Sequence, residues 1–281
     1  MAQPLRISTI SFLNPAPLLW DFEHPPLATE LAQRYTLTYT LPSQCAADLA
    51  ANRADIGLIP IAAYATTPGL RIIPGCTIAS LNKVRSILLV TKKPLAEVRT
   101  VAADTASRSS VAYTQILFRK FIGTDPQFLA APADLAAMLA QADAALLIGD
   151  PALLALQHRD TLDHLAGPTG LWLDLAEEWT TRTNLPWVAA FWAIRADATP
   201  ADPHQLITDL THSRDHGLAN IPAIVHQWQP RIGLPASVIH NYLTTNIHYT
   251  LDVACIAAIK HFFHLAAECN VLPPAPPLDF L

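Results

Sequence analysis

The sequence lacks the long apolar and basic runs that contact with membranes and nucleic acids requires. None of its apolar stretches approaches the roughly 18 residues of a membrane span. The longest, Ile56–Ala65 and Val188–Ile194, have the length of buried strands. Lys and Arg form no cluster, and their 18 residues are outnumbered by 23 Asp and Glu, which gives a net charge of −5. We therefore expect neither a membrane nor a nucleic acid as a partner.

Cysteine is scarce, and its spacing is not that of a metal or redox motif. The chain has four cysteines, Cys45, Cys76, Cys255 and Cys269, and no two of them form a CxxC pair. Cys255 and Cys269 fall among apolar positions of a helical pattern. The spacing favours buried free thiols over disulfides or a metal site.

Charged residues are also few, at 15% of the chain against 51% apolar residues. This balance supplies enough material for buried cores and excludes a disordered chain. With roughly 150 residues per domain as a guide, the 281 residues predict about two domains. The N-terminal segment has no continuous apolar core and no convincing cleavage site, so no secretory signal is predicted. The expected compartment is the cytoplasm.

Well-known catalytic and cofactor-binding motifs are missing from the sequence. It contains no GxGxxG after a strand, no Walker loop, no HExxH and no GxSxG. His261 and His264 are three residues apart, but no third metal ligand accompanies them. We therefore predict no metal and no nucleotide cofactor. Chemistry would have to come from hydroxyl, amide and guanidinium groups.

Short apolar runs alternate with helical patterns, which predicts an α/β protein with mostly parallel strands. The runs expected to form strands are Leu5–Ile10, Tyr35–Leu41, Asp55–Pro60, Val98–Ala103, Ala144–Ile148 and Trp187–Ile194. A first helix is expected over Gln44–Arg53 with Ser43 as its cap. Further helices are expected over His204–His216, Ile221–Trp228, Ser237–Thr244 and Leu251–Cys269. The proline-rich tail beyond them cannot extend the last helix.

Two extended apolar runs, Arg85–Thr91 and Trp187–Ile194, begin about 100 residues apart. The segment between them has its own alternation of strands and helices. This pattern predicts two lobes joined by two crossing strands, with a ligand cleft between the lobes. The first lobe would contain residues 1–91 and 191–281, and the second would contain residues 92–190. One continuous sheet is the alternative.

A cluster of hydroxyl side chains precedes a predicted helix. Thr105, Ser107, Ser109 and Ser110 lie within six residues of one another, together with Arg108. Free N–H groups at a helix start attract anions, and an Arg can bind a carboxylate through two hydrogen bonds. The cluster predicts an anion-binding site. The alternative is that one serine caps the helix and the others face solvent.

Asn14 is held between Pro15 and a large apolar pair in the loop that follows the first predicted strand. Its amide can both donate to and accept from a ligand without carrying charge. The alternative is an Asx turn, in which the side chain bonds its own backbone. Both interpretations stay open from the residues alone.

Ser86 and Asp150 lie at the ends of predicted strands. Alternation places Ser86 on the face opposite Arg85, and a hydroxyl at the start of a crossing strand can orient a polar ligand. A solvated strand end is the alternative for Ser86. Asp150 follows Gly149 after a buried strand, and we expect it to cap the next helix.

Seven segments, in one order along nearly the whole chain, resemble the chorismate dehydratase family. They are ISTISFLNPAPL (7–18), ADIGLIPIAAY (54–64), RSILLVTKKPL (85–95), DTASRSS (104–110), AALLIGDPAL (144–153), DLAEEWTTRTNLPWVAAFWAIR (174–195) and NYLTTNIHYTLD (241–252). The resemblance implies the fold of type II periplasmic binding proteins, in which two α/β lobes enclose a cleft.

The resemblance also implies an activity. Chorismate would lose water to give 3-[(1-carboxyvinyl)oxy]benzoate, in the futalosine route to menaquinone, without metal or nucleotide. Asn14 matches the family's motif asparagine and would align a reacting group, while Ser86 would hold the substrate nearby. Thr105 and the segment Ser107–Ser110, which includes Arg108, would bind its carboxylates. We expect the substrate's own enolpyruvyl carboxylate to take the ring proton, with His24 as the nearest titratable alternative.

Two other functions stay open. A solute-binding protein of the same fold would close on an anion without chemistry, because fold does not determine function. The sibling enzyme of the same pathway, which cleaves a nucleoside-linked intermediate, has a different N-terminal motif from SFLNPAPL. The sequence predicts no particular oligomeric state.

Overall fold

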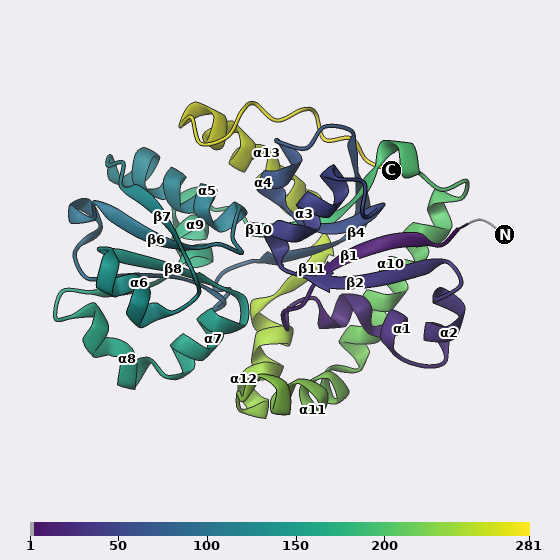
Figure 1. Ribbon diagram of the computed structural model, residues 1–281, viewed down its shortest axis with the longest axis horizontal. Helices are drawn as coiled ribbons and strands as arrows, with labels where there is room; N and C mark the ends of the chain where they lie inside the picture. The colour runs from purple at the N-terminus through teal and green to yellow at the C-terminus, as the bar shows by residue number, and fades with distance from the viewer. Residues whose placement is uncertain (1–2) are drawn as a thin grey trace.

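The computed structural model describes residues 3–281 and contains two separate β-sheets (Figure 1). The first sheet has the order β11-β4-β10-β3-β1-β2, with strands β1 (Leu5–Ile10), β2 (Tyr35–Thr40), β3 (Ile56–Pro60), β4 (Leu70–Ser80), β10 (Trp187–Arg195) and β11 (His248–Leu251). The second has the order β7-β6-β8-β5-β9, with strands β5 (Ile87–Thr91), β6 (Thr100–Asp104), β7 (Gln127–Ala131), β8 (Ala144–Ile148) and β9 (Leu171–Asp174). The described residues therefore do not form one continuous sheet.

Most strands form where the apolar runs predict them, whereas no run predicts β4, β7, β9 or β11. Strands β1 and β8 have the predicted bounds, and the other predicted strands differ from the observed ones by a few residues at most. Every residue of β3, β5 and β8 is buried, which explains why these strands are apolar throughout instead of alternating.

Both sheets are mixed, so the prediction of mostly parallel strands is wrong. Strand β1 is parallel to β2 and β3, and β6 is parallel to β7 and β8. Strands β10 and β5 run antiparallel to their neighbours. The chain enters both strands from the other sheet, through residues 81–86 before β5 and through the helix Leu175–Thr183 and residues 184–186 before β10. These two strands therefore need no helical crossover of the kind that makes neighbours parallel.

The chain passes between the sheets twice, at residues 81–86 and 184–186. The first passage is not extended in the way that alternation predicts, because Arg85 has a left-handed backbone with φ of 62°. Arg85 is exposed while Val84 and Ser86 on either side are buried, so the predicted placement of Ser86 on the face opposite Arg85 is confirmed. The expected boundaries of the two lobes remain a prediction.

Helices cover both sheets. They are α1 (Trp20–Glu23), α2 (Leu27–Leu31), α3 (Pro42–Ala50), α4 (Ile61–Tyr64), α5 (Ser109–Ile116), α6 (Leu135–Gln141), α7 (Gly149–Gln157), α8 (Arg159–Ala166), α9 (Leu175–Thr183), α10 (Pro203–Ala219), α11 (Ile221–Ile232), α12 (Ala236–Asn241) and α13 (Val253–Glu268). Short 3₁₀ or π turns are η1 (Ala16–Leu19), η2 (Leu95–Glu97), η3 (Leu117–Ile122), η4 (Ala196–Ala198) and η5 (Tyr242–Asn246). None of the helices among residues 3–281 is long and apolar enough to cross a membrane.

The helices expected near the C-terminus are confirmed as α10, α11, α12 and α13, with small differences at their ends. Ser43 does not cap α3, contrary to the prediction. Proline suits the first turn of a helix, so α3 begins at Pro42 with Leu41 as its cap residue. Ser43 thus lies inside the helix, and its hydroxyl donates to the Thr105 carbonyl at 3.3 Å.

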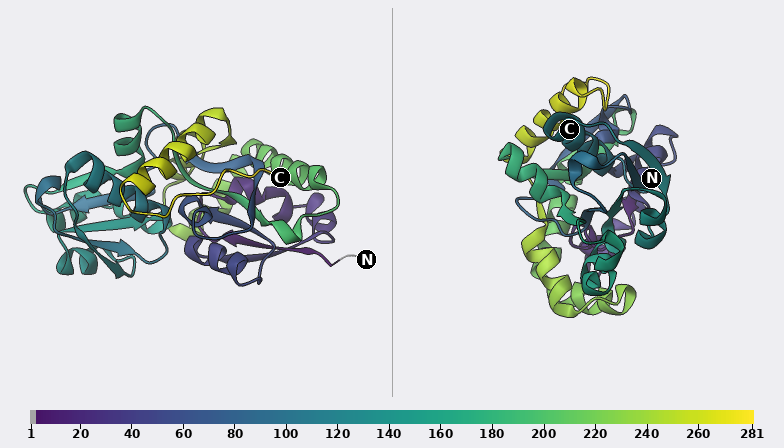
Figure 2. Two further views of the ribbon diagram at one scale, coloured as in Figure 1. Left: turned by 90° about the horizontal axis from the view of Figure 1, so that it is seen from above. Right: turned by 90° about the vertical axis from the view of Figure 1, so that its left-hand side faces the viewer.

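The two sheets lie side by side along the long axis of the molecule, and α13 crosses between them (Figure 2). Helix α13 packs against β10 of the first sheet and against α5, which follows β6 of the second. The rings of Phe262 on α13 and Tyr113 on α5 lie 4.4 Å apart, centroid to centroid. Both side chains are buried, so the apolar core continues from one sheet to the other.

Candidate functional site

The carboxyl ends of strands from both sheets meet at one cavity. Ile10, Pro60 and Ile148, the last residues of β1, β3 and β8, line it, together with the segment that follows β6. About 450 Å³ of space lies between the lining side chains, part of it open to solvent. Ligands of open α/β sheets bind at this kind of position, where strand ends and helix starts converge.

Most of the predicted site residues lie on this cavity. Asn14 lines it from the first sheet, and Ser107, Arg108, Ser109 and Ser110 line it from the second. Residues nearly 100 positions apart in sequence are thus brought to one place. The Asn14 loop and the segment Ser107–Ser110 therefore share one cavity and do not lie on opposite surfaces of the molecule.

Two of the predicted site residues, Ser86 and Thr105, lie outside the group of lining residues. Ser86 adjoins the lining residue Ile87, whereas Thr105 directly follows β6. The Thr105 side chain is exposed, and its backbone N–H donates to Ala131 of the neighbouring strand at 3.2 Å. The chain turns directly after β6, where Asp104 accepts a hydrogen bond from the Ala106 N–H at 2.9 Å. Thr105 sits at the outside of that turn. Contact between its side chain and a cavity ligand remains a prediction.

Two buried polar atoms at the cavity have no hydrogen-bond partner among the described residues. They are Asn14 Oδ1 and Ser107 Oγ. An unpaired buried polar atom costs about 1–3 kcal/mol, so a fold tolerates such atoms where a ligand or water pairs with them. Asn14 Oδ1 makes no bond to its own backbone, so the Asx-turn alternative is not observed.

The start of α5 is not capped by a serine side chain. Arg108 is the cap residue, and no side-chain capping bond is made there. The Ser109 hydroxyl accepts from the Ala62 N–H at 3.1 Å and donates to the Ala189 carbonyl at 3.2 Å. Ser109 therefore fastens α5 to α4 and β10, while the side chains of Ser107 and Arg108 make no hydrogen bond or ion pair with residues 3–281.

The side chain of Asp150 has a different role from the helix cap that the sequence predicts. Asp150 is the second residue of α7, and its side chain does not cap that helix. Its Oδ1 instead accepts the Leu13 N–H at 3.0 Å, which connects the second sheet to the loop that holds Asn14. Burial raises the pKa of Asp150 to about 6, although the bond from Leu13 acts to lower it.

The loop before Asn14 also requires a glycine opposite it. Gly149 has a left-handed φ of 64°, and a Cβ added there would lie 2.5 Å from the ring of Phe12. The Gly149 N–H donates to the Ser86 carbonyl at 2.8 Å. Gly149 therefore allows Phe12, Ser86 and the start of α7 to meet at the edge of the cavity.

Two buried tyrosines hold the residues that the sequence predicts to be catalytic. The Tyr242 hydroxyl donates to Ser86 Oγ at 2.8 Å, and the Tyr249 hydroxyl donates to the Asn14 carbonyl at 3.0 Å. Ser86 is 1% exposed, so the alternative of a solvated strand end does not apply. Nothing in the local sequence marks either tyrosine, because each reaches its partner across more than 150 positions. Their presence in the segment NYLTTNIHYTLD is the one available signal.

His24 is occupied away from the cavity. Its Nδ1 lies 2.9 Å from the Trp20 carbonyl, and its Nε2 lies 2.7 Å from the amide of Gln227. Its ring stacks on that of Trp20 at 3.7 Å. His24 is not one of the residues that line the cavity.

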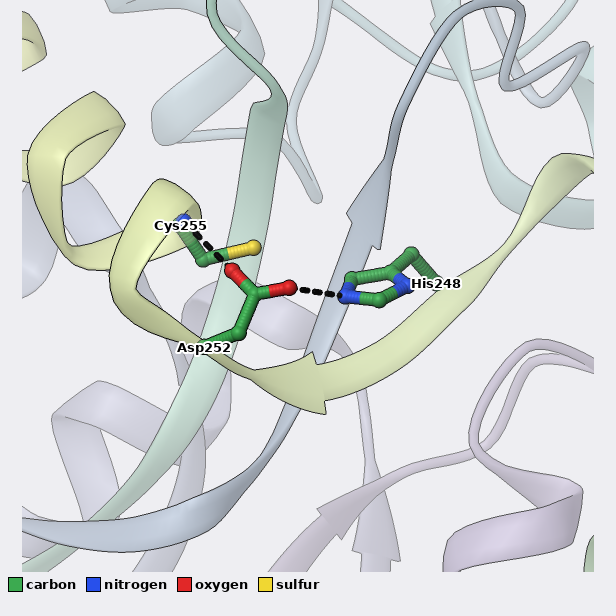
Figure 3. Close-up of side chains that lie close together, drawn as sticks. All are labelled: His248, Asp252 and Cys255. Carbon is green, nitrogen blue, oxygen red and sulfur yellow. Dashed lines mark hydrogen bonds and ion pairs between the residues drawn. The ribbon is translucent and has the colours of Figure 1, made fainter.

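A separate group of metal-ligand types, His248, Asp252 and Cys255, lies at the start of α13 (Figure 3). Both carboxylate oxygens of Asp252 are engaged, one by the Cys255 N–H at 2.8 Å and one by His248 at 2.9 Å. Burial raises the pKa of the Cys255 thiol to about 12, which keeps it protonated. We assign this group to the capping of α13. All four cysteines are free and three are buried, which confirms the prediction of free thiols.

Two α/β lobes with a cleft at their strand ends define the periplasmic-binding-protein-like class of folds. A crystal structure of an Archaeoglobus fulgidus protein superposes with a TM-score of 0.76 at 15% identity, over 96% of this chain and 98% of that one. The periplasmic aliphatic sulphonate binding protein of Escherichia coli superposes with a TM-score of 0.68 at 17% identity, over 99% of this chain and 91% of that one.

The chain belongs to the menaquinone biosynthesis family, whose model matches residues 5–268. A relative in Thermus thermophilus named chorismate dehydratase is 30% identical over 233 residues, which are 79% of this chain and 82% of that protein. The resemblance found in the sequence is thus confirmed.

Proposed function

We propose that this protein is a chorismate dehydratase, which converts chorismate to 3-[(1-carboxyvinyl)oxy]benzoate and water in the futalosine route to menaquinone. The family and the named relative support this proposal. The observation that carries it is the pair of unpartnered buried atoms, Asn14 Oδ1 and Ser107 Oγ, on opposite sides of one cavity. We place the reaction in the cytoplasm, as the sequence predicts.

The reaction balances without an oxidant or reductant. A ring C–H bond and the bond between the ring and its hydroxyl group break, and a ring double bond forms. The proton and the hydroxide leave as one molecule of water. The product ring is aromatic, so the reaction is strongly downhill. The protein therefore has to orient the substrate and polarise the leaving group, rather than supply energy.

A protein base is not required in this scheme. The enolpyruvyl carboxylate of the substrate takes the ring proton, and Asn14 aligns either that carboxylate or the leaving hydroxyl. Ser86 holds the substrate nearby. These roles suit neutral groups whose hydrogen-bonding atoms are already oriented by buried partners.

The two carboxylates of chorismate suit the other wall of the cavity. Arg108 has a side chain free of ion pairs among residues 3–281, and Ser107 supplies an unpaired hydroxyl. The free N–H groups of the first turn of α5 form the positive end of the helix dipole, which attracts an anion. Ser110 also lines this wall, whereas Ser109 is held by backbone groups. Thr105 would join them only after its side chain turned inward.

The test is to incubate the purified protein with chorismate and follow the loss of its diene absorbance, with the product identified by mass. We expect catalytic consumption of chorismate and formation of the enolpyruvyl benzoate. Binding of chorismate without consumption would instead favour a solute-binding protein, the class of the E. coli neighbour. Neither binding nor consumption would favour the sibling enzyme that acts on a nucleoside-linked intermediate.

A further inference from the structure

The Tyr242 hydroxyl contacts Ser86, which the proposed function assigns to holding the substrate. It donates to Ser86 Oγ at 2.8 Å, and the side chain is 1% exposed. Burial raises the pKa of Tyr242 above its ordinary value, whereas hydrogen bonding with the side chains of Ser86 and Asn14 acts to lower it. Tyr242 is thus a neutral donor, and its one hydrogen bond as a donor goes to Ser86.

The charged groups around Tyr242 keep it in that state. Asp150 on α7 and Asp174 at the end of β9 are close enough to raise its pKa further. A phenolate beside two carboxylates would be repelled, so the hydroxyl keeps its proton and directs it to Ser86. Ser86, whose oxygen accepts this hydrogen bond, cannot at the same time donate its own hydrogen to Tyr242.

The Ser86 hydroxyl therefore has a definite polarity. Its oxygen accepts from Tyr242, which leaves its own hydrogen for another acceptor. Ser86 is not itself a lining residue of the cavity, but it adjoins Ile87, which is. Its carbonyl accepts from Gly149, which also lines the cavity. An anionic ligand in the cavity offers the acceptor that Ser86 lacks. Asn14 Oδ1, also unpaired, offers a ligand hydroxyl an acceptor on the same side.

We propose that Tyr242 is a positioning residue that acts through Ser86, making the serine hydroxyl a donor toward an anionic substrate in the cavity. This inference rests on the proposed function. The π-helical turn η5 begins at Tyr242, and π turns occur often at functional sites.

The test compares Tyr242→Phe, Ser86→Ala and the double variant in the chorismate assay. Tyr242→Phe keeps the ring and removes only the donor, and we expect kcat to fall by about 10- to 100-fold with KM changed much less. Because Tyr242 acts largely through Ser86, the double variant should be little worse than Ser86→Ala alone. Thermal unfolding of each variant confirms that it is folded at the assay temperature.

Tyr113→Phe is the matched control. Tyr113 is about equally buried, its hydroxyl donates to the Val188 carbonyl at 3.0 Å, and neither of these two residues lines the cavity. It should lower the unfolding temperature and leave kcat within about twofold. Activity of Tyr242→Phe within twofold of the wild type, or losses that multiply in the double variant, would overturn the inference and leave the proposed function standing. An inactive wild type would overturn both.

Discussion

Asn14 presents a buried amide oxygen to the cavity while its backbone is held by Tyr249. A side chain that is fixed by its backbone and free at its tip is arranged to align a reacting group. Replacement by Ala should therefore lower turnover by roughly 100-fold or more, with the fold intact. Asn82→Ala, at an exposed position, is the control for substitution at an asparagine. Steady-state kinetics with chorismate measures the effect, and turnover within a few-fold of the wild type would remove Asn14 from the mechanism.

Asp150 should make stability depend on pH. Its folded-state pKa, raised by burial from 3.8 to about 6, means that the folded protein binds the proton more tightly than the unfolded chain. Its contribution to stability is therefore fully present below about pH 4 and is lost as the pH rises through about 6, by up to about 3 kcal/mol.

Asp150→Asn keeps an acceptor for Leu13 and removes this titration. The stability of the variant relative to the wild type should rise between pH 4 and pH 7 and then level off. Urea unfolding at a series of pH values measures the difference. A difference that does not change with pH would mean that Asp150 ionises at its ordinary pKa in the folded protein.

At the scale of elements, the loop after β1 is held against the start of α7. Phe12 packs on Gly149, and the Leu13 N–H donates to Asp150. The strand ends bring the two segments together, and the missing side chain of Gly149 lets them touch. The position of Asn14 therefore depends on a contact between the two sheets.

Gly149→Ala should displace Phe12 and with it the Asn14 loop. The added Cβ would meet the ring at 2.5 Å, and Ala in a left-handed conformation adds strain of about 1 kcal/mol. We expect kcat/KM to fall at least tenfold. Gly233→Ala is the matched control, because Gly233 has a similar φ of 68° but no atom near the added Cβ. It should lose stability alone, and equal losses of activity in the two variants would contradict this account.

At the scale of the whole molecule, the C-terminal tail returns to the first sheet. The Ile72 N–H donates to the Asp279 carbonyl at 2.7 Å, and the Leu281 N–H donates to the Ile72 carbonyl at 2.9 Å. The Tyr64 hydroxyl donates to the Pro277 carbonyl at 3.0 Å. The tail lies beyond the segment that matches the family, and none of its residues lines the cavity.

A variant that ends at Leu272 should therefore lose stability without losing activity. Removal of these bonds and of the apolar cover that the tail gives α13 should lower Tm by roughly 5–10 °C. Turnover at 25 °C should stay within twofold of the wild type. Differential scanning calorimetry and the chorismate assay check the two outcomes, and a large loss of kcat would show that the tail supports the cavity.

The sequence by itself determined most of the strands, the helices near the C-terminus and the segments of the site, but it did not indicate β4, β7, β9 or β11. Apolar runs such as Ala144–Ile148 have the length of buried strands, and the hydroxyl cluster at Ser107–Ser110 can be recognised because its members are neighbours in the chain. Only the tertiary structure decided that Asp150 supports the Asn14 loop, that Tyr242 holds Ser86, and that Thr105 faces outward. These contacts join residues far apart in the chain, and they depend on how two sheets and their connections pack. No local pattern of residues specifies such packing.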